Sequence, residues 1–436
     1  MATEAGHQRL ELPYDLSVLR NGVRIASAPV PHAASVSIGV WVGVGGRYEP
    51  ARVAGISHFI EHLLFKGTKR RSARDISREI EGRGGYFNAF TGEEATCYYA
   101  VVPAEHAVRV TGVLADMYLH PRFAAEDIER ERGVIIEEIM MYRDQPSHVV
   151  LEKLGQMLWS HHPLGRPLIG TPETVRRIRR EDLLSFKNTR YVPANTVVVT
   201  AGAVRHEQAV AQADRLWGRI RPARRPAFRR VNRTTGQQRA EVIHRDVEQC
   251  HLAAGFRVFG RHDMRRYALK LLSVILGENM SSRLFQSIRE RRGLAYSIHS
   301  SVRLLEETGA LLITAGLDRK RALEGWRLIV RELARIIRQP VSRAELARAR
   351  DYTVGQLKIG LESSSSRMTW IGEQLLAYNR VMDPKEVVEA YSRITPDDIM
   401  EVARYCLRSG RLSVAAITPD RDLKADHLME EVSQIE

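Results

Sequence analysis

The chain has 436 residues, of which 44% are hydrophobic and 27% charged, with a formal net charge of +14. This length exceeds one ordinary domain and suffices for two domains of about 200 residues each. No apolar run reaches the ~18 residues of a membrane span, and the start, MATEAGHQRLELPYD, resembles neither a secretory signal nor a transit peptide. We therefore expect a cytoplasmic protein that has no membrane-bound part.

In the first third of the chain, strand-like and helix-like patterns alternate. Residues 36–49 (VSIGVWVGVGGRYE) are a β-branched run that ends in a glycine turn, and residues 95–102 (ATCYYAVV) alternate as a strand does. Residues 104–120 and 129–144 place apolar side chains at helical spacing. This alternation predicts α/β or α+β units. Three cysteines, never spaced as CxxC, argue against a disulfide framework and a thiolate metal site.

The second half of the chain repeats the order of the first at a nearly constant shift. Three pairs of segments match in sequence order: 36–49 with 250–263, 79–89 with 287–297, and 178–202 with 394–418. Three such matches indicate a duplicated domain of about 210 residues. The predicted fold is therefore α+β, with two tandem homologous α/β-sandwich domains at residues 1–218 and 240–436.

An arginine-rich segment, residues 219–239, lies where the two copies should join. It contains eight arginines and no acid, and its proline content and low apolar content indicate an exposed linker. The net charge of +14 permits an alternative function, a basic nucleic-acid-binding protein. We expect no nucleic-acid role, because neither an aromatic stacking set nor a base-reading motif accompanies the charge.

The segment GISHFIEHLLFKGT, residues 55–68, combines a buried-helix pattern with His58, Glu61 and His62. Residues four apart share a helix face, so His58 and His62 can direct two imidazole nitrogens at one ion. Glu61 lies beside that face, where it can take a proton from a metal-bound water without ligating the metal. This HxxEH order is the reverse of the HExxH zinc helix. The alternative is two hydrogen-bonded histidines and a solvated carboxylate.

The second copy supports the metal interpretation. Aligning Gly67 with Gly277 sets three apolar residues opposite the polar trio: Ala268, Leu271 and Leu272. A helix in this place can therefore be wholly apolar, and packing does not require the trio. We expect the second domain to lack a metal site.

A third ligand is expected, because a catalytic zinc ion usually has three protein ligands and one position for water. The acidic helix at residues 129–144 offers Glu131, Glu137 and Glu138. Glu131 and Glu138 share a face but lie about 10.5 Å apart along a straight helix. They cannot both bind one ion, so one of them would orient a histidine. Helical geometry alone does not choose between Glu137 and Glu138.

The sequence resembles the pitrilysin or insulinase family of zinc metallopeptidases, peptidase family M16. It is most similar to the short-chain branch, which includes bacterial processing-protease homologues and the β subunit of mitochondrial processing peptidase. The motifs HFIEH, GGYFNAFTGEEATCYY, ERERGVIIEEI, HHPLGRPLIGTPETV, RYVPANTVVV and SSRLFQSIRERRGLAYS carry the resemblance over nearly the whole chain. It implies one Zn²⁺ per chain with Glu61 as the catalytic base, Glu131 orienting a ligand, and three ligands: His58, His62 and Glu138. Glu137 then has no metal role.

The resemblance also implies a substrate-binding edge strand in the NAFT segment, formed by Asn88, Ala89, Phe90 and Thr91. An extended peptide would add to this strand through main-chain hydrogen bonds, which explains weak side-chain specificity. The alternative is that Gly84, Gly85 and Asn88 merely form a turn before the strand.

In the second copy, Arg289 and Tyr296 match an arginine and a tyrosine seven residues apart in related family members. The resemblance implies that this pair binds the substrate carbonyl and stabilises the oxyanion of the tetrahedral intermediate. The alternatives are a solvated helix charge for Arg289 and a packing role for Tyr296.

The expected function is a zinc-dependent endopeptidase that hydrolyses unfolded peptides or short polypeptides enclosed between two subunits. The zinc set and the Arg–Tyr pair occur in one chain, which favours a homodimer in which each chain completes the other's site. A heterodimer with a non-catalytic homologue is the alternative. A non-catalytic scaffold or partner subunit of the same fold is the alternative function.

Overall fold

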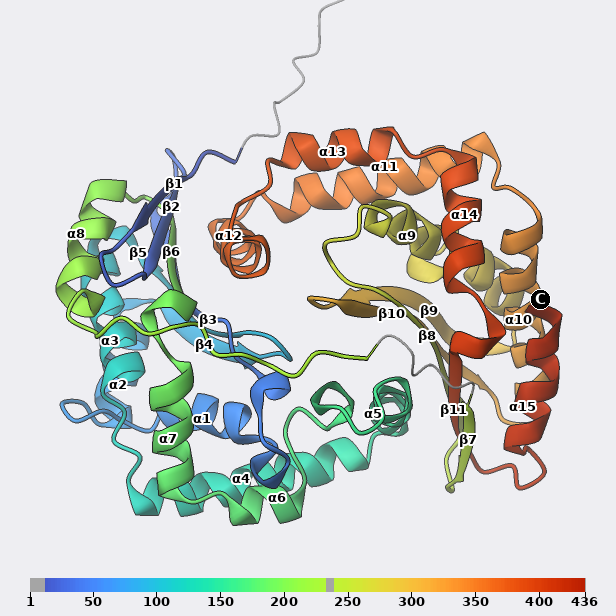
Figure 1. Ribbon diagram of the computed structural model, residues 1–436, viewed down its shortest axis with the longest axis horizontal. Coiled ribbons are helices and arrows are strands. Elements are labelled where there is room, and N and C mark those ends of the chain that lie inside the picture. Colours follow the sequence, from blue (N-terminus) through green and yellow to red (C-terminus); the bar gives the residue numbers. More distant parts are fainter. Residues whose placement is uncertain (1–11, 233–238, 436) are drawn as a thin grey trace, which may run out of the picture. The chain divides into compact units, whose positions relative to one another are not determined.

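A computed structural model of the protein describes residues 12–232 and 239–435 (Figure 1). The chain forms two compact units, each built around one β-sheet. The first unit comprises residues up to Glu137, Pro167–Phe228 and Gln356–Glu389; the second comprises Glu138–Arg166, Arg229–Gly355 and the residues from Ala390 onward. Within the described ranges, no helix is long and apolar enough to cross a membrane.

The sheet of the first unit has six strands in the order β1-β2-β6-β3-β5-β4. The strands are β1 (Asp15–Val18), β2 (Arg24–Pro29), β3 (Ser35–Val42), β4 (Tyr86–Thr91), β5 (Thr96–Pro103) and β6 (Thr196–Gly202). Neighbouring strands are antiparallel, except for the parallel pair β2–β6. Strand β4 pairs with β5 alone, with Asn88 opposite Tyr99, and therefore forms an edge of the sheet.

Helices cover both faces of this sheet, with α3 and α8 on one side and α12 on the other (Figure 1). The helices of the unit are α1 (Ile56–Leu64), α2 (Ala73–Ile80), α3 (Ala107–Leu119), most of α4 (Ala125–Arg143), α6 (Pro172–Arg177), α7 (Arg180–Arg190), α8 (His206–Trp217) and α12 (Ser364–Tyr378). Gly39 permits a close approach of α12, because a Cβ there would lie 2.3 Å from the sulfur of Met368. Met368 packs with Trp41 and Val197 in the core.

The second unit contains a five-stranded sheet in the order β7-β11-β8-β10-β9. Its strands are β7 (Arg239–His244), β8 (Gln249–Phe259), β9 (Ala295–Leu304), β10 (Thr308–Asp318) and β11 (Leu412–Thr418). Its helices are α5 (Pro146–Leu158), α9 (Arg266–Ser273), α10 (Ala322–Arg338), most of α11 (Arg343–Gly360), α14 (Pro396–Cys406) and α15 (Ala425–Val432), while α13 (Pro384–Ser392) spans the boundary at Glu389. Helix α5 covers one face, and α10 and α14 lie on the other (Figure 1).

The predicted duplication and the α+β class are confirmed. The matched segments 178–202 and 394–418 both form a helix followed by a strand, α7 with β6 and α14 with β11. The structure adds an exchange that the sequence did not reveal. Helix α12 from the second half of the chain packs on the first sheet, and α5 from the first half packs on the second sheet.

The segment predicted as a linker, residues 219–239, begins without regular secondary structure at residues 219–232. Residues 233–238 lie outside the described ranges. Phe228 is half-buried, and the guanidinium of Arg47 lies 3.8 Å from the centre of its ring. The predicted linker therefore begins within the first unit, where Phe228 packs against Arg47.

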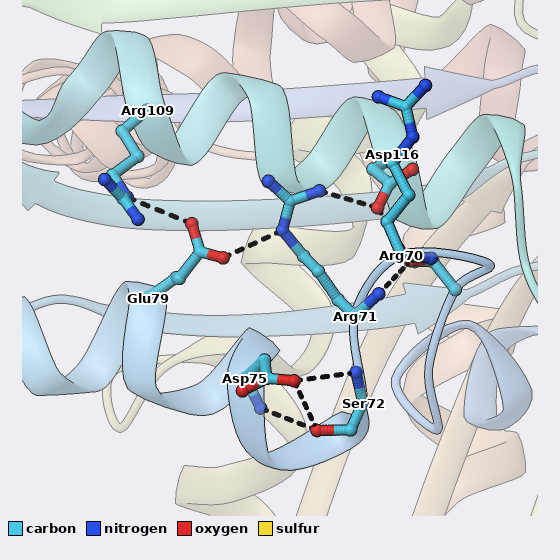
Figure 2. A network of polar contacts seen from close by, with 8 residues as sticks. Arg70, Arg71, Ser72, Asp75, Glu79, Arg109 and Asp116 are labelled. Atoms are coloured by element: carbon cyan, nitrogen blue, oxygen red, sulfur yellow. Dashed lines mark hydrogen bonds and ion pairs between the residues drawn. The ribbon is translucent and has the colours of Figure 1, made fainter.

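A network of ion pairs ties the loop after α1 to helices α2 and α3 (Figure 2). Buried Asp116 on α3 accepts hydrogen bonds from Thr68 Oγ1 at 2.7 Å and from the Arg71 guanidinium at 2.6 Å. Arg71 also donates to Glu79 on α2 at 2.9 Å, and Arg109 donates to the same carboxylate at 3.0 Å. Since a charge-assisted hydrogen bond contributes about 1.5–3 kcal/mol, the bonds to buried Asp116 hold the loop after α1 against α3.

Candidate metal centre

Helix α1 begins at a position that only glycine tolerates well. Gly55 precedes the helix with φ of 93°, and a Cβ on it would lie 2.6 Å from the carbonyl oxygen of Ile169. The buried carboxylate of Glu49 accepts hydrogen bonds from the backbone N–H groups of Gly55 at 2.7 Å and Ser57 at 2.8 Å. A carboxylate at a helix N-terminus satisfies free N–H groups and complements the helix dipole. The first turn, which leads into His58, is therefore fixed.

Three potential metal ligands converge at the junction of α1 and α4. His58, His62 and Glu138 each offer one ligand atom, and these atoms lie within 4.8 Å of one another. The boundary between the two compact units, Glu137/Glu138, falls inside the continuous helix α4. Two imidazoles and one carboxylate are the donor set of a three-ligand zinc site. The residues present therefore fit a zinc ion.

The protonation state of His58 suits a metal ligand. Burial and, to a smaller extent, the nearby His62 together lower the pKa of His58 to about 3. The ring centroids of the two histidines lie 4.5 Å apart. A neutral imidazole keeps a lone pair for a metal, so His58 is ready to ligate at physiological pH.

Glu131 lies beside the cluster and contacts His62. Its side chain is buried, and Oε2 lies 3.2 Å from Nδ1 of His62 while Oε1 lies 2.8 Å from Nζ of Lys66. A carboxylate that accepts the Nδ1–H of a histidine fixes the ring orientation and leaves Nε2 for the metal. Of the three acidic candidates, the structure brings Glu138 into the ligand cluster and Glu131 against a ligand, whereas Glu137 is exposed.

Tyr142 is a neighbour of the cluster that the sequence did not reveal. It lies one helical turn after Glu138, and its ring stacks on that of His148 with the ring centroids 4.4 Å apart. Burial raises the pKa of Tyr142, and the Glu138 carboxylate raises it further. Tyr142 therefore stays protonated and can hold Glu138 in one orientation.

Glu61 is held by a threonine on the edge strand. Thr91 Oγ1 donates a hydrogen bond to Glu61 Oε2 at 2.5 Å, and Thr96 Oγ1 lies 3.5 Å from Thr91 Oγ1. Thr96 in turn donates to the carbonyl oxygen of Val44 at 2.9 Å. The hydroxyl of Thr91 therefore joins strand β4 to the carboxylate, while the hydroxyl of Thr96 bonds to the backbone after β3. One oxygen of Glu61 is thereby oriented by the protein itself.

The predicted substrate strand is the edge strand β4, which ends at Thr91 beside Glu61. Asn88 and Phe90 are exposed, with Phe90 39% accessible, whereas Ala89 is half-buried. Within the part of the chain that the structure describes, the far edge of β4 pairs with no other strand. Its backbone groups are the kind that an extended peptide can pair with.

Arg289 and Tyr296 lie next to each other in the second unit. The guanidinium of Arg289 lies 5.8 Å from the ring centre of Tyr296 and 4.8 Å from that of Phe285. Tyr296 is 75% accessible, which is unusual for a large aromatic side chain and does not fit a packing role. Three residues of this unit align with His58, Glu61 and His62 of the first. They are buried in the core of the second unit: Ala268, Leu271 and Leu272.

His58, Glu61 and His62 stand in HxxEH order on α1, and the carboxylate of Glu138 from a second helix joins the two histidines. The model of the insulinase family, peptidase family M16, matches residues 24–172. The model of the peptidase M16 inactive domain matches residues 177–352, which include Arg289 and Tyr296. This chain belongs to peptidase family M16.

Relatives agree with this assignment, and a solved structure shares the fold. The chain is 39% identical to an uncharacterized zinc protease of Mycobacterium tuberculosis, over 92% of either chain. It is 34% identical to an uncharacterized zinc protease of Bacillus subtilis, over 93% of this chain and 98% of that one. Its fold is similar to that of a protease from Helicobacter pylori, with a TM-score of 0.88, 22% identity, and coverage of 94% of this chain and 100% of the other.

Proposed function

We propose that the protein is a zinc endopeptidase that hydrolyses extended peptides and short unfolded polypeptides. The observation that carries the proposal is the convergence of His58, His62 and Glu138, with Glu61 on the same helix as the two histidines. The family membership and the zinc-protease names of the relatives support it. The donor set of the three ligands supports one zinc ion per chain.

The protein would hold zinc through the imidazoles of His58 and His62 and the carboxylate of Glu138. A bound zinc ion supplies Lewis acidity, which polarises the scissile carbonyl and lowers the pKa of water. The Glu131 carboxylate contacts Nδ1 of His62 and so keeps the imidazole in an orientation in which Nε2 points away from Glu131. Tyr142 performs the corresponding task for Glu138.

Glu61 is the general base in this proposal. Its oxygen Oε2 accepts the hydrogen bond of Thr91, which orients the carboxylate that takes the proton from water. The protonated carboxyl then donates this proton to the leaving amine of the cleaved peptide bond. General acid–base catalysis of this kind contributes about 10²–10⁴-fold to the rate.

The substrate would bind as an additional strand on β4. Main-chain hydrogen bonds along Asn88–Thr91 hold the peptide regardless of its side chains, and the strand ends at the residue that contacts Glu61. A strand added here therefore runs toward the general base. Arg289 and Tyr296 are proposed to bind the substrate carbonyl and to stabilise the oxyanion.

We further propose that two copies of the chain enclose the substrate, and that Arg289 and Tyr296 of one copy complete the zinc site of the other. The exposure of Tyr296 supports this assignment, because an exposed aromatic ring beside an arginine is available to a partner or a substrate. Enclosure would restrict the substrates to unfolded chains.

A peptide library and a chelator test the proposed function. The purified zinc-loaded protein is incubated with a mixture of peptides about 10–30 residues long, and the fragments are identified by mass spectrometry. We expect internal cleavage that stops on addition of the chelator and returns with zinc. Zinc-loaded protein that leaves every peptide intact would identify the chain as a non-catalytic member of the family.

A further inference from the structure

A basic groove lies beside α4, α6 and α7 in the first unit, apart from the metal centre. Its cavity has a volume of about 670 Å³ and is lined by six arginines: Arg52, Arg132, Arg176, Arg177, Arg179 and Arg180. The groove also contains two glutamates, Glu129 and Glu181, but no lysine. We refer to this cavity as the arginine groove.

The acidic groups around the arginine groove are largely neutralised already. Glu129 is bound by the fork of Arg132, with Nε and Nη2 at 3.1 and 3.0 Å from its two oxygens. Asp182, on the adjacent helix α7, forms an ion pair with Arg52. Glu181 is the remaining acid of the lining.

Four arginines of the groove follow one another closely in the chain, at the end of α6 and the start of α7. All four are exposed, and Arg180 donates to the carbonyl oxygen of Phe123 at 2.8 Å. Within residues 12–232 and 239–435, Arg176 and Arg177 form neither a hydrogen bond nor an ion pair through their side chains. Like charges repel one another, so the excess positive charge of the groove carries an energetic cost.

The chemistry of the groove favours carboxylates. The guanidinium group presents a planar fork of donors that matches a carboxylate, and the Arg132–Glu129 pair shows this geometry inside the groove. Ala125, the first residue of α4, also lines the cavity, so the positive end of this 19-residue helix adds to the field. A ligand that brings two or more carboxylates close together would relieve the repulsion.

We propose that the arginine groove binds a short acidic segment of a polypeptide, one with clustered Asp or Glu side chains. A cavity of about 670 Å³ accepts a few side chains rather than a folded domain. Arg176 and Arg177 provide the two guanidinium groups that are available to the ligand. The groove requires neither zinc nor Glu61, so this proposal does not depend on the proposed peptidase activity.

Binding of a labelled peptide tests the proposal. The probe is a fluorescent peptide with four glutamates in six residues, and its control has glutamine at the same positions. The protein is the zinc-loaded Glu61→Gln chain, which avoids cleavage of the probe. By fluorescence anisotropy we expect the glutamate peptide to bind about tenfold or more tightly than the glutamine peptide, since each charged contact contributes more than a neutral one.

Two double variants with the same charge change locate the site. Arg176→Gln with Arg177→Gln should weaken binding of the glutamate peptide by about tenfold or more. Arg74→Gln with Arg78→Gln removes two exposed arginines from α2 in the same unit and should leave binding unchanged. Arg132 is left intact, because it also donates to the carbonyl oxygens of Val175 and Ile178 and so supports the local fold.

The possible results separate clearly. Equal binding of the two peptides, or equal losses in the two double variants, would overturn the proposal by showing only a general charge effect. Inorganic tripolyphosphate that binds more tightly than the glutamate peptide would overturn it in favour of a phosphate site. Circular dichroism verifies that both double variants are folded.

Discussion

Thr91 Oγ1 donates a hydrogen bond of 2.5 Å to Glu61 Oε2, and this contact joins the end of strand β4 to helix α1. The strand proposed to receive the substrate and the helix that carries the proposed general base are therefore mechanically linked. A carboxylate fixed through one oxygen presents the other in a constant direction, which is the preorganisation that proton transfer needs.

Replacement of Thr91 by Val tests this positioning role. Valine keeps the shape and the backbone pairing of β4 but removes the hydroxyl donor. We expect kcat to fall by about tenfold, with little change in KM and in zinc content, and Thr91→Ser to restore most of the rate. A Thr91→Val protein with the kcat of the wild type would exclude this role, as would a Ser variant that fails equally.

Substitutions in α1 should separate metal binding from proton transfer. Glu61→Gln leaves all three ligands in place, so we expect bound zinc at the wild-type level with a loss of about 10²–10⁴-fold in kcat. His58→Ala removes a ligand and should lose both zinc and activity. Zinc content is measured by atomic absorption alongside peptide cleavage. Full turnover by the Glu61→Gln protein would remove Glu61 from the mechanism.

Glu131 and Glu137 provide a matched pair on the same helix. Glu131 is buried against His62 and Lys66, whereas Glu137 is exposed. Glu131→Gln should weaken zinc binding by about 10–100-fold, because it alters the acceptor that orients a ligand histidine. Glu137→Gln should leave zinc affinity unchanged. Competition with a chromophoric chelator measures both, and equal affinities in the two variants would contradict the assignment of Glu131.

Mixing inactive chains tests whether two copies share a site. Glu61→Gln and Arg289→Ala chains should each be nearly inactive alone. If Arg289 acts on the zinc site of its partner, a mixed dimer contains one complete site, and part of the rate should return. A mixture of Glu61→Gln and His58→Ala chains is the control, since neither contributes an intact zinc set. Recovery in the control mixture, or none in the test mixture, would argue against sharing.

Lys187 gives a prediction about stability and pH. Its side chain is buried beside Tyr118, and burial lowers its pKa to about 8 from the usual value near 10.5. Below pH 8 the lysine is charged in both folded and unfolded states, and the folded state bears the full cost of burial. Between pH 8 and about 10.5 the folded state loses the proton first, so its stability rises relative to the unfolded state.

Replacement of Lys187 by Met should therefore stabilise the protein at pH 7 by up to about 2–3 kcal/mol. The gain should shrink by pH 10, because the wild-type lysine is then largely neutral in the fold. Urea unfolding of both proteins at the two pH values measures the difference. If the Met variant were more stable than the wild type by the same amount at pH 7 and pH 10, the pKa of Lys187 would not be lowered as expected.

Local spacing allowed the prediction of much of the site. The two histidines and the glutamate of α1 follow from residues three and four apart on one helix, and the acidic helix α4 follows from its own pattern. Sequence geometry could not choose between Glu137 and Glu138; the family resemblance pointed to Glu138, and the structure places that residue in the cluster. The contacts of Glu61 with Thr91 and of Glu131 with Lys66 depend on how separate elements pack. No spacing rule encodes such contacts.

The duplication could also be predicted from the sequence, because strand and helix patterns recur in the same order in the two halves of the chain. The exchange of α5 and α12 was not, since each helix has an ordinary amphipathic pattern that is compatible with either sheet. Which sheet receives which helix is decided by local fits, such as the approach of Met368 to Gly39.

The exchanged helix α12 has a consequence for folding during translation. A ribosome releases the chain from its amino end, yet helix α12 (Ser364–Tyr378), which packs on the sheet face around Trp41 and Val197, is translated long after β3. More than half of the chain must be translated after β3 before that face is shielded from water. Nascent chains should therefore engage a holdase chaperone until late in translation.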